Sequence, residues 1–347
     1  MKFICQNIYD YFIRKRNSSF DNAIISNWEE LPNIKEKYFK LSYDKLTVCV
    51  GNLSFGGTGK TPLIAELINN YLPQDLSKCI IERGYKKYQK GDYFLNSENI
   101  DENSIEFAGD EALMLFEKTK IPVSISKKKY RAYFNAINKF EPECIIVDDG
   151  YQHRWILPDL NILILDEKTI KKPFYPPFGK LRESLQNSYR ANIILVPKGS
   201  KNEIVISENQ ICLEFEILPG KIYSSTNSDD ISKSKKYIAL AGIANPNRFI
   251  QTLHDNEIQL IKSLFFSDHQ VYKIKDINKI INFTKVYTSG IITTEKDFVK
   301  LRKFSNEFVK NEISLFIQPI EFKIIDENNQ LKNIIEEILI TKNIKAL

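Results

Sequence analysis

The segment Ser54-Phe-Gly-Gly-Thr-Gly-Lys-Thr61 is the most informative part of the sequence, because it joins two segments of different character. Before it, Leu46 to Val50 is a short apolar run typical of a buried strand. After it, Lys60 to about Tyr71 has helical character, with Pro62 in the first turn, where a missing N–H costs little. A strand, a glycine-rich turn and a helix in this order predict a turn that binds phosphate.

The turn nearly matches the Walker A pattern G-x-x-x-x-G-K-[ST], with a serine in place of the first glycine. Its glycines permit positive φ and a close approach of backbone amides to phosphate oxygens. We expect Lys60 to reach the β- and γ-phosphates and Thr61 to ligate Mg²⁺. The predicted nucleotide-binding residues are Ser54, Phe55, Gly56, Gly57, Thr58, Gly59, Lys60 and Thr61. The alternative is a glycine-rich turn that binds no ligand.

Two acidic residues follow another apolar run, from Glu143 to Val147. Asp148 and Asp149 therefore have the Walker B arrangement, at the carboxyl end of a strand, where ligands bind in open parallel sheets. Together with Thr61 they can supply the protein's share of a Mg²⁺ site, although the sequence does not say which aspartate contacts the metal. The alternative is a pair of surface acids at a strand end.

The remaining pattern predicts an α/β protein with a P-loop NTPase-like, mostly parallel sheet and a second, smaller α/β domain. Nearly continuous apolar runs alternate with helical segments, which is typical of a parallel sheet covered on both faces. Further strands are expected at Lys78–Ile81, Val123–Ser126, Asn161–Leu165 and Asn192–Val196, and helices at Asp110–Lys118 and Lys127–Phe140.

The composition changes after residue 200, which suggests a domain boundary. We expect a P-loop domain over 1–210, an extended two-segment linker over 211–235, and a smaller α/β domain over 236–347, leaving open a return of the last helix to the first domain. Gln210–Leu218 and Lys221–Ser225 flank Pro219-Gly220, so the pattern predicts a hairpin.

Composition excludes several classes of protein. The chain has 347 residues and a net charge of +5, with basic residues scattered rather than clustered, so no nucleic-acid partner is expected. Five dispersed cysteines and three dispersed histidines give no disulfide framework or metal cluster, and strand thiols such as Cys49, Cys79 and Cys144 are expected to be buried. No obligate protein partner is evident.

No apolar stretch approaches the roughly 20 residues that span a bilayer. The N-terminal segment places Ile4, Ile8, Tyr11 and Phe12 on one helical face, followed by the basic run Arg14–Arg16. Such a helix can lie on an anionic membrane surface or pack on its own domain, and both readings stay open.

The nucleotide is expected to be ATP. GTPases usually read guanine with N-K-x-D after a strand, whereas the nearest string here, Asn138-Lys-Phe-Glu141, has the wrong acid and precedes a strand.

The chain resembles the tetraacyldisaccharide 4′-kinase (lipid A 4′-kinase) family. The resemblance covers about residues 50 to 300 and begins with the turn itself, Val50 to Pro62. The further matching blocks, in order, are Arg83-Gly-Tyr85, Gly109-Asp-Glu111, Asp148-Asp-Gly-Tyr-Gln-His153, Pro177-Phe-Gly-Lys-Leu-Arg-Glu183, Ala241–Phe249, Asp268-His269 and Thr293-Thr-Glu-Lys-Asp297. Ser184 departs from the proline common in the family, and the N-terminus diverges.

The resemblance implies transfer of the ATP γ-phosphate to the 4′-hydroxyl of a tetraacylated glucosamine disaccharide 1-phosphate, a lipid A precursor, at the cytoplasmic face of the bacterial inner membrane. It implies a site in the cleft between two domains.

Specific roles follow for three residues. Asp110 is expected to accept the proton of the acceptor hydroxyl, His269 to be its partner from the second domain, and Arg182 to neutralise phosphate charge. Their structural alternatives are a helix cap, a surface loop histidine and an ion pair with an acid. His153 is expected to support the Walker B turn, and no role is assigned to Asp297.

Two other functions compete with this reading. One is a P-loop kinase acting on a soluble hydroxyl acceptor, and the other is a nucleotide-dependent binding or switch protein.

Overall fold

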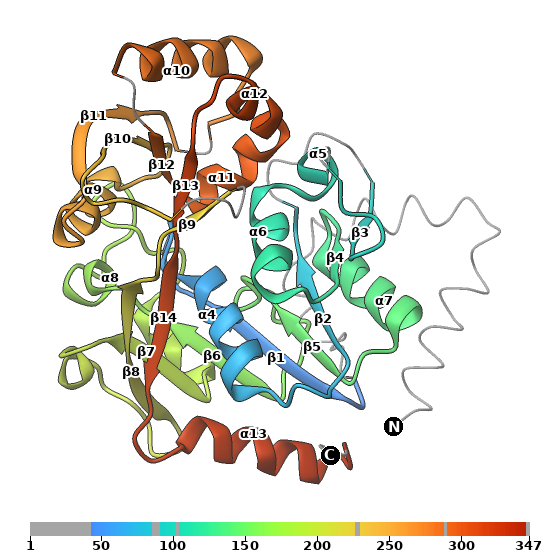
Figure 1. Ribbon diagram of the computed structural model, residues 1–347. Helices are drawn as coiled ribbons and strands as arrows, with labels where there is room; N and C mark the ends of the chain where they lie inside the picture. Colours follow the sequence, from blue (N-terminus) through green and yellow to red (C-terminus); the bar gives the residue numbers. More distant parts are fainter. Residues whose placement is uncertain are drawn as a thin grey trace.

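The computed structural model describes residues 43–84, 91–101, 104–225, 230–268, 270–287 and 290–344. The expected N-terminal helix and the expected catalytic residue His269 lie outside these residues. The described strands form a nine-stranded and a five-stranded sheet (Figure 1).

The large sheet has the order β14-β8-β7-β6-β1-β5-β2-β4-β3. Its strands are β1 (Leu46–Gly51), β2 (Lys78–Glu82), β3 (Tyr93–Leu95), β4 (Val123–Ile125), β5 (Cys144–Val147), β6 (Leu160–Ile164), β7 (Ile193–Pro197), β8 (Ile211–Pro219) and β14 (Ile320–Ile325). The interior pairs are parallel, and only β14 with β8 and β3 with β4 run antiparallel. The predicted fold class, α/β with a large mostly parallel sheet, is confirmed.

The small sheet has the order β11-β10-β12-β13-β9. Its strands are β9 (Tyr223–Ser224), β10 (Lys236–Ala241), β11 (Gln259–Phe265), β12 (Gly290–Thr294) and β13 (Leu315–Gln318). The helices of the described chain are α4 (Lys60–Glu66), α5 (Ser104–Ala108), α6 (Asp110–Thr119), α7 (Lys129–Phe140), α8 (Glu167–Lys171), α9 (Pro246–Asp255), α10 (Ile274–Tyr287), α11 (Glu295–Leu301), α12 (Ser305–Lys310) and α13 (Gln330–Thr341). Shorter helical turns are Leu67–Tyr71 (π), and Leu185–Arg190, Lys201–Glu203 and Arg302–Phe304 (3₁₀).

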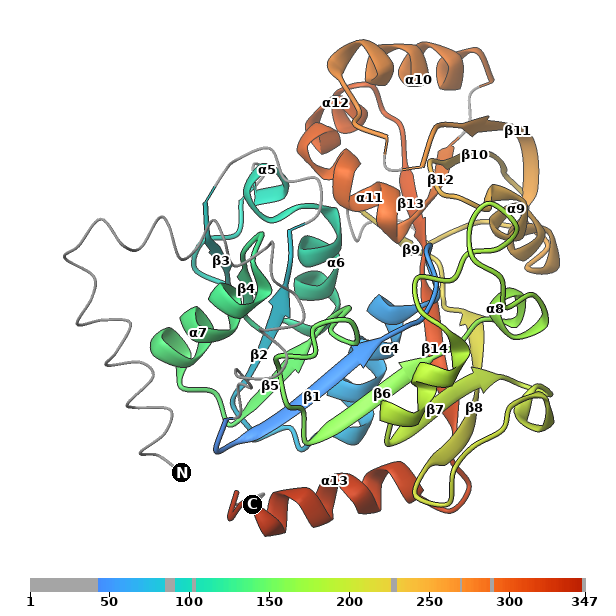
Figure 2. The ribbon, with the colours of Figure 1, turned by 180° about the vertical axis from the view of Figure 1, so that it is seen from behind.

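Both faces of the large sheet are covered, as the apolar strands predict. On one face, side chains of α4, α6 and α13 share a core with alternate residues of β1 and β5, such as Val48 and Ile146. Figure 1 looks onto this face, and Figure 2 shows the other. There α7 packs on Ile81 and Ile145. The thiols of Cys49, Cys79 and Cys144 are buried and free, which confirms that expectation.

The hairpin predicted around Pro219-Gly220 is wrong. β8 pairs with β7 and with β14 in the large sheet, whereas β9 pairs with β13 in the small sheet. The physical reason is that the apolar side chains of β8, including Phe215, are buried against the large core, so the chain crosses between sheets instead of reversing. The predicted domain boundaries remain a prediction.

The chain returns to the large sheet along β14, and the last helix, α13, buries Leu331, Ile335 and Leu339 in the large core. Near this return, the side chain of Gln318 donates hydrogen bonds to the carbonyls of Gly220 (2.8 Å) and Pro319 (2.9 Å). Gln318, at the end of β13, therefore links the two places where the chain passes between the sheets, Gly220 after β8 and Pro319 before β14.

The helix after β12 joins the two sheets. α11 packs on α6, and Lys118 of α6 forms a 2.8 Å ion pair with Glu295 of α11. Arg302 also pairs with Glu117. These contacts hold the small-sheet region against the helix that begins at Asp110. Among the described residues, no helix is long and apolar enough to cross a bilayer.

Candidate active site

The predicted phosphate-binding turn links β1 to α4. Gly56 and Gly59 have φ of 112° and 92°, a region that side chains other than glycine rarely adopt. Gly59 caps α4, and its carbonyl accepts the first helical hydrogen bond from Leu63 N–H (3.0 Å). A Cβ on Gly59 would lie 3.2 Å from Ile217 Cδ1. The glycines therefore allow a tight change of direction that places Lys60 and Thr61 at the start of a helix.

The turn is held in shape by buried polar contacts and by a neighbouring segment. Asn52 donates a 3.1 Å side-chain hydrogen bond to Thr58, and both residues are buried. The Phe55 N–H donates to the Lys180 carbonyl (2.7 Å), and Ser54 forms an isolated β-bridge with Leu181. The Ser54 that replaces the first Walker glycine thus anchors the turn to residues 180–181.

Asp149 is the electrostatic centre of the site. Its carboxylate lies 3.2 Å from the Lys60 ammonium and accepts two hydrogen bonds from the Arg182 guanidinium, at 2.9 and 3.0 Å. Burial works to raise the pKa of Asp149, but the hydrogen bond from Arg182 and the charges of Lys60 and Lys129 outweigh it and hold the pKa well below its usual range. The Walker A lysine and the Walker B aspartate therefore meet in space.

Arg182 is expected to neutralise phosphate charge, and that role stays a prediction. Besides Asp149, it donates to the Ser54 carbonyl (2.9 Å) and to the Asn52 side chain, and its guanidinium lies 5.7 Å from the centre of the Phe55 ring. The ion pair with Asp149 is compatible with either reading of Arg182. Arg182 thereby ties the phosphate-binding turn to the Walker B aspartate.

Asp148 is buried, and its charge acts on two further acids, Glu82 and Glu111. Burial and the charge of Asp148 raise the pKa of Glu82 well above its usual range. Burial, Asp148 and Asp110 raise the pKa of Glu111 to about 7. Asp110 is itself largely buried at the start of α6, where its carboxylate accepts a hydrogen bond from the Glu111 N–H (3.1 Å). The site therefore concentrates carboxylates beside the phosphate-binding turn.

Lys129 offsets part of this negative charge. It is buried at the start of α7, and its ammonium donates to the main-chain carbonyls of Asp148 and Asp149, the latter at 2.9 Å. Sequence reasoning missed Lys129, Glu82 and a role for Glu111. The available signals were an acid at the end of a strand, Glu82, and an acid beside Asp110.

The donor set of this region fits a hard cation such as Mg²⁺, which takes oxygen ligands and keeps several waters. Within the described chain, Asp148 Oδ1 is buried and has no hydrogen-bond partner, whereas both oxygens of Asp149 are engaged by Arg182. In the same part of the chain, no group of three or more His, Cys, Asp or Glu side chains is placed to hold an ion.

The small-sheet region reaches the site through Lys296 of α11. Lys296 forms a 2.9 Å ion pair with Asp268, and its charge acts to lower the pKa of Glu111. The residue beside Asp268, His269, lies outside the described residues. The observed contacts thus bring the loop that carries Asp268 close to the start of α6.

Asp297, which had no assigned role, is fully buried and holds the small-sheet region together. Its carboxylate accepts hydrogen bonds from Gly242 N–H (2.8 Å), Thr294 Oγ1 (2.8 Å) and Tyr272 Oη (3.1 Å). It also forms a 2.7 Å ion pair with Lys300. These partners come from three separate segments, at residues 242, 272 and 294–300, so Asp297 is a structural residue of this region.

His153 lies close behind the Walker B acids. Its backbone N–H donates to the Gly150 carbonyl (2.8 Å), and its ring packs edge-on against Trp155, with 5.7 Å between the ring centroids. Burial, followed by the charge of Lys129, lowers its pKa to about 3. His153 is therefore neutral and part of the packing of this turn.

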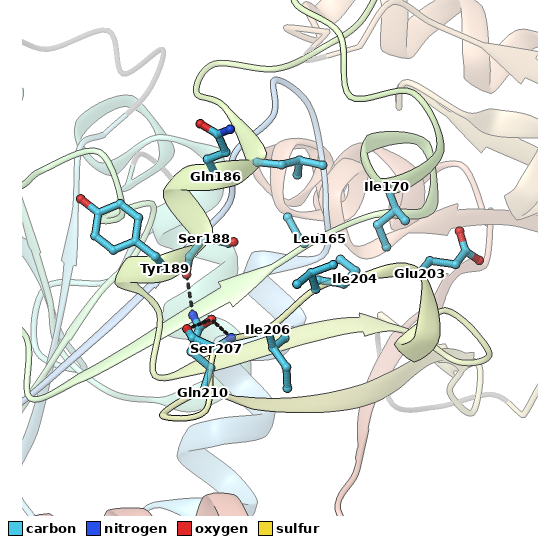
Figure 3. Close-up of a pocket in the computed structure, with 12 residues that line it drawn as sticks. Leu165, Ile170, Gln186, Ser188, Tyr189, Glu203, Ile204, Ile206, Ser207 and Gln210 are labelled. Carbon is cyan, nitrogen blue, oxygen red and sulfur yellow. Dashed lines mark hydrogen bonds between the residues drawn. The ribbon is translucent and has the colours of Figure 1, made fainter.

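A pocket of about 530 Å³ lies apart from the phosphate-binding turn (Figure 3). It is lined by the 3₁₀ turn Leu185–Arg190 and by residues 203–210, where the Gln210 side chain donates to the Ser188 carbonyl (2.7 Å). Its floor includes Leu165 and Ile170, which belong to a core cluster of the large sheet. None of the predicted site residues lines it.

Comparisons with known proteins show the family of the chain. The family model described as tetraacyldisaccharide-1-P 4′-kinase matches residues 34–340. Relatives named tetraacyldisaccharide 4′-kinase include those of Aquifex aeolicus (30% identical, covering 88% of this chain and 90% of the relative) and Haemophilus influenzae (30%, covering 84% and 82%). The crystal structure of LpxK from Aquifex aeolicus in complex with ATP superposes with a TM-score of 0.71 at 26% identity, covering 91% of this chain and 95% of that one. The chain therefore belongs to the tetraacyldisaccharide-1-phosphate 4′-kinase family.

Proposed function

We propose that the protein transfers the γ-phosphate of ATP to the 4′-hydroxyl of a tetraacylated glucosamine disaccharide 1-phosphate, giving the 1,4′-bisphosphate of lipid A biosynthesis. The main observation in support is the contact between Lys60, at the end of the phosphate-binding turn, and Asp149, in a chain that belongs to this family. The reaction is proposed to occur at the cytoplasmic face of the bacterial inner membrane, with the protein bound peripherally.

The phosphate-binding turn supplies positioning, which is most of what phosphoryl transfer requires of a protein. Backbone amides of residues 56–61, at the start of α4, would face the phosphates, whereas the Phe55 N–H is bound to the Lys180 carbonyl. Lys60, held by Asp149 without nucleotide, would exchange that partner for the β- and γ-phosphate oxygens. Arg182 remains on Asp149 and keeps the turn and the Walker B strand in register.

Thr61 and Asp148 would hold Mg²⁺, which when bound neutralises charge on the phosphate oxygens and fixes their orientation. Asp148 is preferred to Asp149 because it has a buried oxygen with no hydrogen-bond partner among the described residues, whereas Asp149 is engaged by two cations. Glu82, whose pKa is raised, would support Asp148 as a neutral neighbour.

Asp110 is proposed as the general base. The oxygen of the acceptor hydroxyl forms the new bond to the γ-phosphorus as the bond to the leaving ADP oxygen breaks, and Asp110 takes the hydroxyl proton. A carboxylate at a helix start is a weak base, since the helix dipole favours its ionised form. A partner that shares the proton would help, and His269 is proposed for that role because the neighbouring Asp268 reaches this region through Lys296.

The test is a phosphotransfer assay with ATP, Mg²⁺ and tetraacyldisaccharide 1-phosphate in detergent. We expect a bisphosphorylated product that disappears in Lys60→Ala. Asp110→Ala should lower kcat by more than about 10²-fold, the usual contribution of a general base. Near-wild-type turnover of Asp110→Ala would remove it from that role.

Other outcomes identify the alternatives. Activity on water-soluble sugars without detergent or lipid would indicate a kinase for soluble acceptors. ATP binding without phosphorylation of any acceptor would indicate a binding or switch protein.

A further inference from the structure

An exposed loop beside the phosphate-binding turn is built from aromatic, proline and lysine residues. This segment, Lys172-Pro-Phe-Tyr-Pro-Pro-Phe-Gly-Lys180, is called the aromatic loop below. Phe178 is 83% exposed, Phe174 57% and Tyr175 52%. Single exposed apolar residues are ordinary, but three exposed aromatic rings within five residues form a patch that calls for a partner.

The aromatic loop presents these rings from a defined backbone. The N–H groups of Phe178 and Gly179 donate to the Tyr175 carbonyl (3.0 and 2.9 Å), and Leu181 N–H donates to the Phe174 carbonyl (3.0 Å). A Cβ on Gly179 would lie only 2.0 Å from the Phe174 oxygen, so the loop closes as tightly as glycine allows. The backbone of the loop therefore holds the rings in exposed positions, and binding would cost little further conformational entropy of the backbone.

The base of the aromatic loop is part of the active-site framework. The Lys180 carbonyl accepts the Phe55 N–H (2.7 Å), the next residue, Leu181, bridges to Ser54, and Arg182 holds Asp149. Phe55, on the phosphate-binding turn itself, is 54% exposed. Whatever surface binds the aromatic loop is consequently held next to the nucleotide site.

The charge around the rings is mainly positive. Lys168, Lys171, Lys172 and Lys180 are exposed within residues 166–180, against the acids Asp166 and Glu167, of which Glu167 pairs with Lys171. Aromatic rings that sit at the headgroup level, flanked by lysines that attract anionic lipid, are the composition of an interfacial membrane contact.

We propose that the aromatic loop inserts Phe174, Tyr175 and Phe178 into the interface of an anionic phospholipid bilayer and so holds the P-loop site at the membrane surface. This role rests on the proposed function, because a lipid acceptor would reach the P-loop site from the bilayer surface. A bilayer is favoured over a second copy of the chain because of the positive charge around the rings.

Insertion is tested directly with Phe178→Trp in the full chain, mixed with vesicles of phosphatidylethanolamine and phosphatidylglycerol that carry brominated acyl chains. The wild type supplies the background from Trp28 and Trp155. The matched control is Val286→Trp, at a position on α10 that is 76% exposed. We expect bromolipid quenching above background for Phe178→Trp and none above background for Val286→Trp, with weaker quenching in phosphatidylcholine vesicles.

Quenching of Phe178→Trp no greater than the wild-type background would overturn the proposal, even if another segment carries the protein to the vesicles. So would self-association of the chain that buries residue 178 away from lipid, detected by analytical ultracentrifugation with and without vesicles.

A second pair of variants separates this inference from the proposed function. Phe174→Ser/Phe178→Ser should weaken vesicle flotation by at least about tenfold, because two aromatic rings no longer leave water. It should also slow phosphorylation of acceptor embedded in vesicles while leaving activity on acceptor in detergent. Val286→Ser should change neither. Quenching of Phe178→Trp without phosphorylation of the acceptor in any form would support insertion of the aromatic loop and refute the proposed function. Phosphorylation of the acceptor without quenching would support the proposed function and refute insertion of the aromatic loop.

Discussion

Replacing Gly59 with alanine tests whether the phosphate-binding turn depends on a left-handed backbone. Gly59 has φ of 92°, and forcing an L-residue into this region costs about 1–2 kcal/mol. The new Cβ would lie 3.2 Å from Ile217 Cδ1 and 3.5 Å from Phe322 Cε2, which adds crowding of about 1 kcal/mol. Alanine also restricts the unfolded chain, which returns about 0.4–1 kcal/mol. The expected net loss in the free energy of unfolding is about 1–2 kcal/mol.

The matched control lies two residues away. A Cβ on Gly57 meets no atom within 4 Å, and Gly57 is not among the glycines with positive φ. Gly57→Ala should therefore leave the free energy of unfolding unchanged or raise it by up to about 1 kcal/mol.

Both variants would be compared with the wild type by urea unfolding, followed by circular dichroism without nucleotide. If Gly59→Ala were as stable as Gly57→Ala, the backbone at residue 59 would not have the strained conformation, and the derivation of the turn would be wrong.

Three further changes test other parts of the site. Arg182→Lys should lower the free energy of unfolding by about 1–2 kcal/mol, because an ammonium group cannot span both oxygens of Asp149 and also reach Ser54 and Asn52; urea unfolding equal to wild type would contradict it. The contribution of His153 to stability should fall by about 1–2 kcal/mol between pH 7 and pH 5, because the unfolded histidine takes up a proton below its usual pKa of 6.5 whereas the folded one does so only near 3. The raised pKa of Glu111 acts in the opposite direction over the same interval, so the test compares the wild type with the His153 variant. His153→Gln should remove that loss, and an unchanged difference between unfolding curves at the two pH values would show that His153 is not buried as described. Asp297→Asn should cost about 2–4 kcal/mol, since an amide has one acceptor oxygen where the carboxylate has two, and it carries no charge to pair with Lys300; thermal unfolding within a degree of wild type would exclude this role.

The secondary structure around the site was predictable because its signals are local. A strand, a glycine-rich turn and a helix occupy consecutive residues, and β1 has nearly the predicted bounds. α4 begins at Lys60 as predicted but ends at Glu66, and the π turn Leu67–Tyr71 covers the rest of the predicted helix. The apolar strand before Asp148 also appears as β5. In these segments, backbone propensity and hydrophobic pattern point to the same structure, and no distant contact overrides them.

The α/β class, the phosphate-binding turn and the acids at the end of β5 could thus be predicted from local sequence. Which distant residues contact them depends on how the chain packs. Glu82 reaches Asp148 because β2 and β5 are neighbours in the sheet, and Arg182 reaches Asp149 because residues 180–182 lie against the turn. Likewise, β8 pairs with β14 over a hundred residues away instead of forming a hairpin with β9. Periodicity specifies which face of a strand is buried, but not which strand lies beside it, because pairing is selected by the packing of the whole core.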